Sequence, residues 1–172
     1  MHDQRLVNLL GAAALAINDV LLAEVHSTGA VSASAASALV TLAQSPGLGV
    51  TDLGRRVGLS QSATTRMVDA MEAAGLIRRA PGAGRLVGVS LTPSGSETAG
   101  RILAARARRL TALVSDLDAH EREALTELLV KLLARLYGEI GSADLLCRLC
   151  DRGCCTRSAV CPVGQAERDR EA

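Results

Sequence analysis

The stretch that decides the fold reads Gly58-Leu59-Ser60-Gln61-Ser62-Ala63-Thr64-Thr65-Arg66-Met67-Val68-Asp69-Ala70-Met71-Glu72-Ala73-Ala74-Gly75. Ser60 stands where a helix N-cap is expected, because a serine side chain can accept a hydrogen bond from the first turn. Val68 and Met71 recur at helical spacing and require a core to pack against. Most of the other positions carry short polar or basic side chains that can contact phosphates and base edges. A helix with one packed face and one such polar face is typical of the second helix of a helix-turn-helix motif, which enters a DNA groove.

The residues before this stretch predict the first helix of the same motif. Leu53 and Val57 lie four residues apart and so share one helical face. Thr51 is the expected N-cap, and Gly58 is expected to end the helix. Two short helices joined by a turn of three to four residues that contains glycine have the helix-turn-helix spacing.

After Gly75 the periodicity changes to that of strands. Residues 76–80 and 86–91 predict two strands, and residues 81–84 a tight turn between them. A basic hairpin directly after a helix-turn-helix is a wing, and Arg85 lies beside its tip. We expect Arg85 to enter a minor groove, where the narrow walls strengthen the negative potential.

Long helices are expected on both sides of this unit, at about 4–26, 94–114 and 119–140, with Asp118 or Ser115 capping the last. The first and last of them carry more apolar surface than one neighbour can cover, which predicts burial against a second subunit. The predicted fold class is therefore mainly α with a small β-wing. It is a winged helix-turn-helix domain flanked by long N- and C-terminal dimerisation helices.

Charge and composition narrow the class of ligand. The segment from Thr51 to Leu110 contains ten arginines and four acidic residues, although the formal net charge of the whole chain is only +1. Such a concentration of arginine around a recognition helix is the footprint of a phosphate-binding surface. Tyr137 is the only Phe, Trp or Tyr in the chain, which argues against a base-stacking surface for single strands or RNA.

The predicted contacts to double-stranded DNA fall into three groups. Those to the major groove and its phosphates are Ser60, Gln61, Ser62, Thr64, Thr65 and Arg66. Arg85 is assigned to the minor groove. Attraction to the phosphate backbone is assigned to Arg55, Arg56, Arg78 and Arg79.

Neither a membrane segment nor an enzyme is predicted. No uninterrupted apolar run approaches the roughly 18 residues of a membrane span, and the N-terminus lacks a secretory pattern, so we expect a cytoplasmic protein. No base, oxyanion or phosphate-loop motif that would indicate catalysis is present.

All five cysteines lie within fifteen residues near the C-terminus, at Cys147, Cys150, Cys154, Cys155 and Cys161. A C-x-x-C step lets two thiolates reach one metal, and two further cysteines can complete a four-sulfur set. We predict the ligands Cys147, Cys150, Cys155 and Cys161, with Cys154 as the alternate to Cys155. The cofactor is zinc or an iron–sulfur cluster, since both accept four thiolates. The alternatives are a thiol or disulfide redox sensor and an inert tail.

The order of the predicted elements resembles the MarR family of bacterial transcription regulators. The residues that carry the resemblance are 51–69, 71–79 and Leu91-Thr92-Pro93-Ser94-Gly95, and with the flanking helices it covers about 4–140. It implies a winged-helix homodimer whose two recognition helices read a palindromic operator. Members of the family usually repress genes and respond to small phenolic ligands, oxidants or metals. Their wing normally carries an acidic residue shortly before its arginine, and the turn before Arg85 lacks it.

The sequence thus predicts a homodimeric DNA-binding regulator, a repressor, with a metal- or redox-responsive cysteine cluster and a possible small-molecule or redox effector. Residues 1–140 form the MarR-like domain, with the winged helix at about 32–92, and residues 141–172 form a cysteine-rich tail. The alternative is a redox or electron-transfer metalloprotein that uses the winged-helix scaffold for protein contacts.

Overall fold

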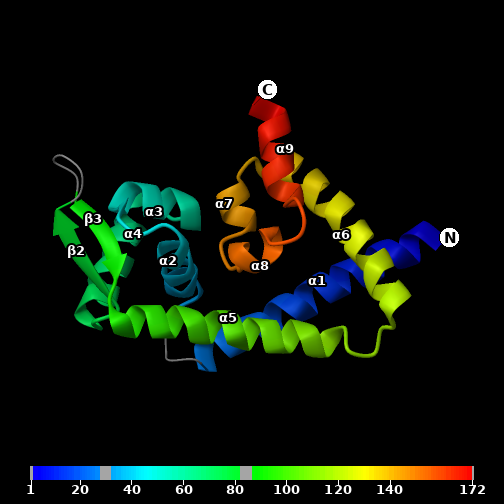
Figure 1. The fold of residues 1–172 in the computed structure, drawn as a ribbon, viewed down its shortest axis with the longest axis horizontal. Helices are drawn as coiled ribbons and strands as arrows, with labels where there is room; N and C mark the ends of the chain where they lie inside the picture. The colour runs from blue at the N-terminus through cyan, green and yellow to red at the C-terminus, as the bar shows by residue number, and fades with distance from the viewer. Residues whose placement is uncertain (1, 28–31, 82–86, 172) are drawn as a thin grey trace.

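The computed structural model describes residues 2–27, 32–81 and 87–171. It is mostly helical with one small sheet, so the predicted fold class is confirmed (Figure 1). The strands are β1 (Leu48–Gly49), β2 (Ile77–Pro81) and β3 (Val87–Leu91). The helices are α1 (His2–Ser27), α2 (Ala33–Gln44), α3 (Val50–Val57), α4 (Gln61–Ala73), α5 (Pro93–Leu113), α6 (Ala119–Ile140), α7 (Ala143–Leu146), α8 (Arg152–Thr156) and α9 (Pro162–Glu171).

The sheet is antiparallel, with β3 between β1 and β2. The two strands of the predicted wing are present, and Arg79 of β2 stands opposite Val89 of β3. The third strand, β1, was not predicted. It pairs Leu48 with Val89, and its two residues are too few to show the alternation by which a strand is recognised in a sequence.

Three of the predicted helix caps can be compared with the structure. The Ser60 side chain accepts from the amide of Ala63 at 3.4 Å, and Asp118 forms a capping box with Glu121, so both are confirmed. The assignment of Thr51 is wrong. Because β1 runs directly into α3, the helix begins at Val50 and Gly49 is the N-cap, without a side-chain hydrogen bond.

The core lies where α2 packs against α5, α3 and β3. Its largest fully buried side chains include Leu39 and Leu42 of α2, Leu53 of α3 and Val68 of α4. Ile102 of α5 completes the same cluster. Since α4 contributes its apolar face to this core, its opposite face is left on the surface of the molecule.

The helices α1 and α6 extend away from the winged helix and leave apolar side chains exposed. By length and composition alone, residues Asp3–Val25 of α1 could cross a membrane, with a mean hydropathy of 1.9. The sequence contains no uninterrupted apolar run of that length, but the polar residues that interrupt α1 still leave its mean hydropathy high. A helix buried between subunits passes the same test. The exposed apolar residues are Leu6, Val7, Leu9, Leu10, Leu15 and Ile17 on α1, and Leu128, Leu129, Val130, Leu132, Leu136 and Ile140 on α6.

The residues after α6 fold back between the winged helix and α6 (Figure 1). Gly141, in the left-handed conformation with φ 69°, ends α6 where the tail was predicted to begin. Helix α9 packs along α6, where Val163 and Tyr137 are buried, and α7 contacts both α3 and α6. The tail therefore connects the winged helix to the helices beyond it.

Candidate DNA-binding surface and cysteine cluster

The outer face of α4 carries most of the residues predicted to contact the major groove. Gln61, Ser62, Thr65 and Arg66 are exposed, as is the capping residue Ser60. These side chains leave hydroxyl, amide and guanidinium groups at the surface, and such groups bind phosphates and base edges. The structure thus brings five of the six predicted residues together on one helical face.

Thr64 is the exception, and the prediction that it is exposed is wrong. Its side chain is fully buried, and its hydroxyl donates to the carbonyl of Ser60 at 2.8 Å. Thr64 packs onto Gly54 of α3, where a Cβ would lie 2.3 Å from Thr64 Oγ1. Thr64 and Gly54 therefore form the contact that sets α4 against α3. In the sequence, a glycine in the middle of a short helix is the feature that could have indicated this close contact, and Gly54 is that glycine.

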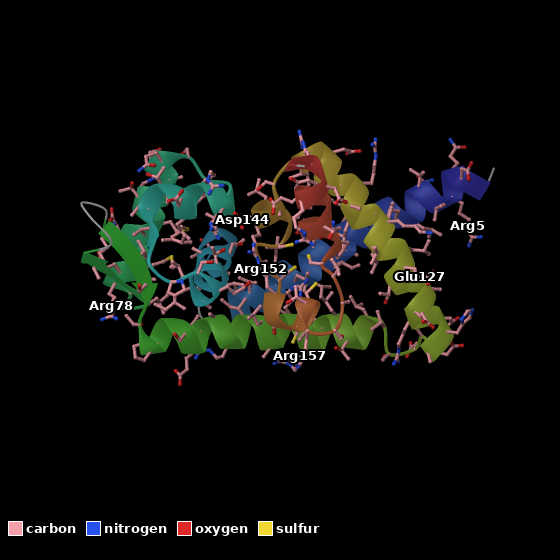
Figure 2. All side chains as sticks on the ribbon, turned by 45° about the horizontal axis from the view of Figure 1, so that its top comes forward. Arg5, Arg78, Glu127, Asp144, Arg152 and Arg157 are labelled. Atoms are coloured by element: carbon pink, nitrogen blue, oxygen red, sulfur yellow. The ribbon has the colours of Figure 1, made fainter. Side chains whose placement is uncertain are left out.

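Three of the arginines predicted to contact DNA are exposed. Arg66 and Arg78 are exposed, and Arg78 lies on the wing side of the molecule (Figure 2). Arg55 is also exposed and pairs with Asp52 at 3.7 Å, an interaction that solvent weakens. Arg85 lies outside the described residues.

Arg79 is engaged within the protein. Its Nη2 lies 2.6 Å from Asp69 Oδ1, its Nη1 pairs with Glu72, and its amide donates to Glu72 Oε1 at 3.1 Å. The hydrogen bond to Asp69 raises the pKa of the guanidinium, with Glu72 acting in the same direction. Arg79 therefore joins the wing to α4, and two carboxylates offset its charge.

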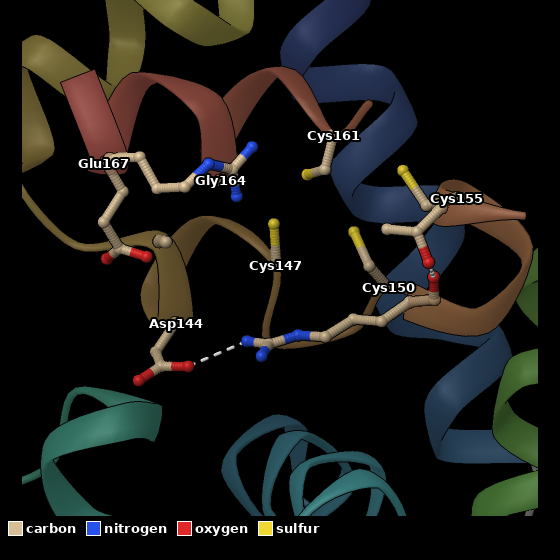
Figure 3. Close-up of a pocket in the computed structure, with 11 residues that line it drawn as sticks. Asp144, Cys147, Cys150, Cys155, Cys161, Gly164 and Glu167 are labelled. Atoms are coloured by element: carbon tan, nitrogen blue, oxygen red, sulfur yellow. Dashed lines mark hydrogen bonds and ion pairs between the residues drawn. The ribbon is translucent and has the colours of Figure 1, made fainter. Parts of the chain in front are cut away.

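Arg56 faces the tail. Its Nε lies 3.6 Å from Asp144 Oδ2, and its Nη1 donates to Ser45 Oγ at 3.3 Å. Asp144 also accepts from Arg152 Nη2 at 2.8 Å (Figure 3). The carboxylate of Asp144 thus bridges the helix-turn-helix and the cysteine segment, an arrangement that the spacing of the sequence could not reveal.

The four predicted ligands line one cavity of about 220 Å³. Cys147 follows α7, Cys155 belongs to α8 and Cys161 directly precedes α9, with Cys150 in the turn after α7. Figure 3 shows the thiols of all four directed into the same space. Cys154 does not line this cavity. It is exposed on the side facing α5, and its amide donates to Asp151 at 3.0 Å.

Hydrogen bonding and arginines polarise the cluster. The hydrogen bond with Cys147 lowers the pKa of the Cys150 thiol, and the positive charges of Arg106, Arg152 and Arg148 act in the same direction. The same hydrogen bond raises the pKa of Cys147. The pair therefore favours one thiolate beside one thiol, and a thiolate is the form that binds metals.

The four thiols line a shared cavity, but they do not converge on one point. Within residues 2–27, 32–81 and 87–171, no three His, Cys, Asp or Glu side chains are arranged to hold a single metal ion. The grouping of four cysteines was therefore predictable from their spacing, whereas the size of the space between them was not.

Residues 31–83 match the MarR family. The chain carries a MarR family domain. The matched residues include α2, β1, α3, α4 and β2, which are the core of the winged helix and its exposed helix. A comparison with curated protein sequences found no match.

Solved structures of MarR family proteins share this architecture. YusO from Bacillus subtilis is 26% identical, with a TM-score of 0.67 over 77% of this chain and 96% of its own. A MarR family transcriptional regulator from Silicibacter pomeroyi is 28% identical, with a TM-score of 0.56 over 74% and 86%. A MarR family protein from Bacillus stearothermophilus is 23% identical, with a TM-score of 0.69 over 82% and 96%. The chain thus shares the fold of MarR family transcriptional regulators.

Proposed function

We propose that the protein is a transcriptional repressor that binds a palindromic operator as a homodimer. The observation that supports this most directly is the outer face of α4, where Gln61, Ser62, Thr65 and Arg66 are exposed while Val68 anchors the helix in the core. A rigidly held helix with exposed polar side chains can enter a major groove and read base edges there.

The exposed apolar faces of α1 and α6 support the homodimer. Leu10 and Leu132 are 50% and 40% exposed, and the other apolar side chains of these faces are exposed with them. An apolar surface of this extent is typical of an interface between subunits. Two copies joined there carry two α4 helices, as a palindromic operator requires. A monomeric mass by light scattering at micromolar concentration would contradict this part of the proposal.

The cysteine cluster supports a response to metal or redox state. Its segment touches α3 through Asp144 and α2 through Gln44, whose Nε2 donates to the carbonyl of Cys150 at 2.8 Å. A change at the thiols would therefore reach α2 and α3. A non-enzymatic role in the cytoplasm accords with this proposal, because such a regulator acts by binding DNA.

The proposal is tested by titrating a labelled DNA fragment from upstream of the protein's own gene at fixed salt. Arg66→Ala removes an exposed charge from α4 and should weaken binding by about 1–3 kcal/mol. Arg5→Ala is the matched control, since Arg5 is exposed at the end of the molecule opposite Arg78 (Figure 2) and should leave the affinity unchanged. Equal affinities for Arg66→Ala and the wild type would contradict the assignment of DNA binding to α4.

The cavity between the cysteines supports a second candidate, a redox or electron-transfer metalloprotein that uses the winged helix for protein contacts. The same titration separates the two. A chain that binds a metal group but shows no affinity for DNA above that for competitor would favour the second candidate.

A further inference from the structure

We propose that Cys147, Cys150, Cys155 and Cys161 hold an iron–sulfur cluster rather than a zinc ion, with Cys154 outside the ligand set. The part of this inference that concerns regulation rests on the proposed DNA-binding function. The part that concerns the cluster does not.

The number and direction of the thiols are the first argument. Three short segments of the tail each bring at least one cysteine to the same cavity, and the four thiols are directed into it (Figure 3). Four thiolates are the usual ligand set of iron–sulfur clusters. The adjacent Cys154 is exposed outside the cavity, so the structure distinguishes two neighbours that the sequence spacing left equivalent.

The size of the cavity distinguishes the two metal groups. In a zinc site four sulfurs lie about 2.3 Å from one ion, and tetrahedral geometry then brings them within about 3.8 Å of each other. Among the described residues no three potential ligands are arranged for a single ion, and the cavity that the four cysteines line together with seven other residues has a volume of about 220 Å³. A cluster of iron and sulfide needs more room than one zinc ion, and this cavity provides that room.

Charged side chains of both signs line the cavity. A cluster held by four thiolates is anionic, and Arg152 and Arg168 line the cavity. Two acidic residues, Asp144 and Glu167, line it as well. Asp144 is paired with Arg152 at 2.8 Å and with Arg56, so its charge is offset.

The tail also needs a cross-link of this kind. Helices α7 and α8 have four and five residues, and neither has a buried residue. Helices this short are not stable alone, and a metal group that binds the folded tail supplies folding free energy. The cluster would join the turn after α7, helix α8 and the start of α9 at one point.

The cluster lies beside the helix-turn-helix. Leu145 packs against Gly58, which ends α3 with φ 74°: a Cβ on Gly58 would lie 2.9 Å from Leu145 Cδ2. Leu145 is two residues before Cys147, so α7 joins the cluster to the turn between α3 and α4. Loading and loss of the cluster would therefore order and release the segment that contacts this turn.

The test is a metal and sulfide analysis of the full chain, purified without oxygen and also reconstituted with ferrous iron and sulfide. The expected result is a brown protein with iron and acid-labile sulfide in equal amounts. The iron and sulfide contents should fall about tenfold or more below those of the wild type in each of four single variants: Cys147→Ser, Cys150→Ser, Cys155→Ser and Cys161→Ser. Cys154→Ser is the matched control and should retain them fully.

Three results would overturn the inference. The first is stoichiometric zinc without sulfide, and the second is a colourless, metal-free chain after reconstitution. The third is loss of the cluster in Cys154→Ser together with its retention in Cys155→Ser. Far-UV circular dichroism and the thermal transition of each variant show whether the winged helix remains folded.

DNA titrations of the same samples separate this inference from the proposed function. A chain that binds its operator but takes up no cluster on reconstitution would contradict only the inference. A chain that holds the cluster without affinity for DNA would contradict only the regulatory function.

Discussion

In the winged helix, Leu39, Leu53 and Val68 have no exposed surface, whereas Val163 is the one buried residue among the described residues of the tail. The two regions are of similar helical character but differ in what can stabilise them. Burial of aliphatic side chains suffices for the winged helix, because each one contributes about 1.5–3 kcal/mol. The tail has almost no such contribution. It depends on polar contacts to α2 and α3, on packing of α9 along α6, and on whatever its cysteines bind.

The largest expected effect concerns the core of the winged helix. Leu39→Ala should lower the free energy of unfolding by about 2–5 kcal/mol, because it leaves a cavity where the side chain was fully enclosed. The matched change in the tail is Leu145→Ala, at a partly exposed position, and should cost about 1 kcal/mol or less. Urea unfolding followed by far-UV circular dichroism measures both. Equal losses would mean that the two regions form one cooperative core.

A smaller effect is expected at the contact between the two regions. Asp144→Asn weakens the pairing with Arg56 and Arg152, whose side chains are 24% and 43% exposed, so the change in unfolding free energy should stay within about 1 kcal/mol. The tail should nevertheless be cleaved faster in limited proteolysis, since its link to α3 is lost. Asp116→Asn, in the loop before α6, is the control and should leave the cleavage rate unchanged. An unchanged rate in Asp144→Asn as well would show that this carboxylate does not hold the tail.

The sequence predicted the winged helix well because its signals are local. The apolar spacing of Leu53 and Val57, the cap at Ser60 and the change of period after Gly75 each reflect neighbouring residues. The sequence-based predictions were wrong where a contact with a residue far away in the chain determines whether a side chain is exposed. Thr64 looks like its exposed neighbours in the chain, and only its packing on Gly54 buries it.

The same limit applies to the arginines and the cysteines. Nothing in the local sequence of Arg56 indicates that Asp144, nearly ninety residues later, lies beside it. The cysteine spacing predicted a shared site, because residues three apart can reach one ligand. Which of Cys154 and Cys155 lines the cavity depends on how α8 is oriented against α9, and the sequence left that choice open.

We propose that the exposed face of α4 reads DNA sequence. The most direct test is the ratio of two affinities, for the upstream fragment and for a scrambled fragment of equal length, measured at one salt concentration. We predict a ratio of about 10³ or more for the wild type, as specific binding requires, and a clearly lower ratio for Gln61→Ala, whose amide can read a base edge. A wild-type ratio near one, with both fragments bound equally, would contradict the claim.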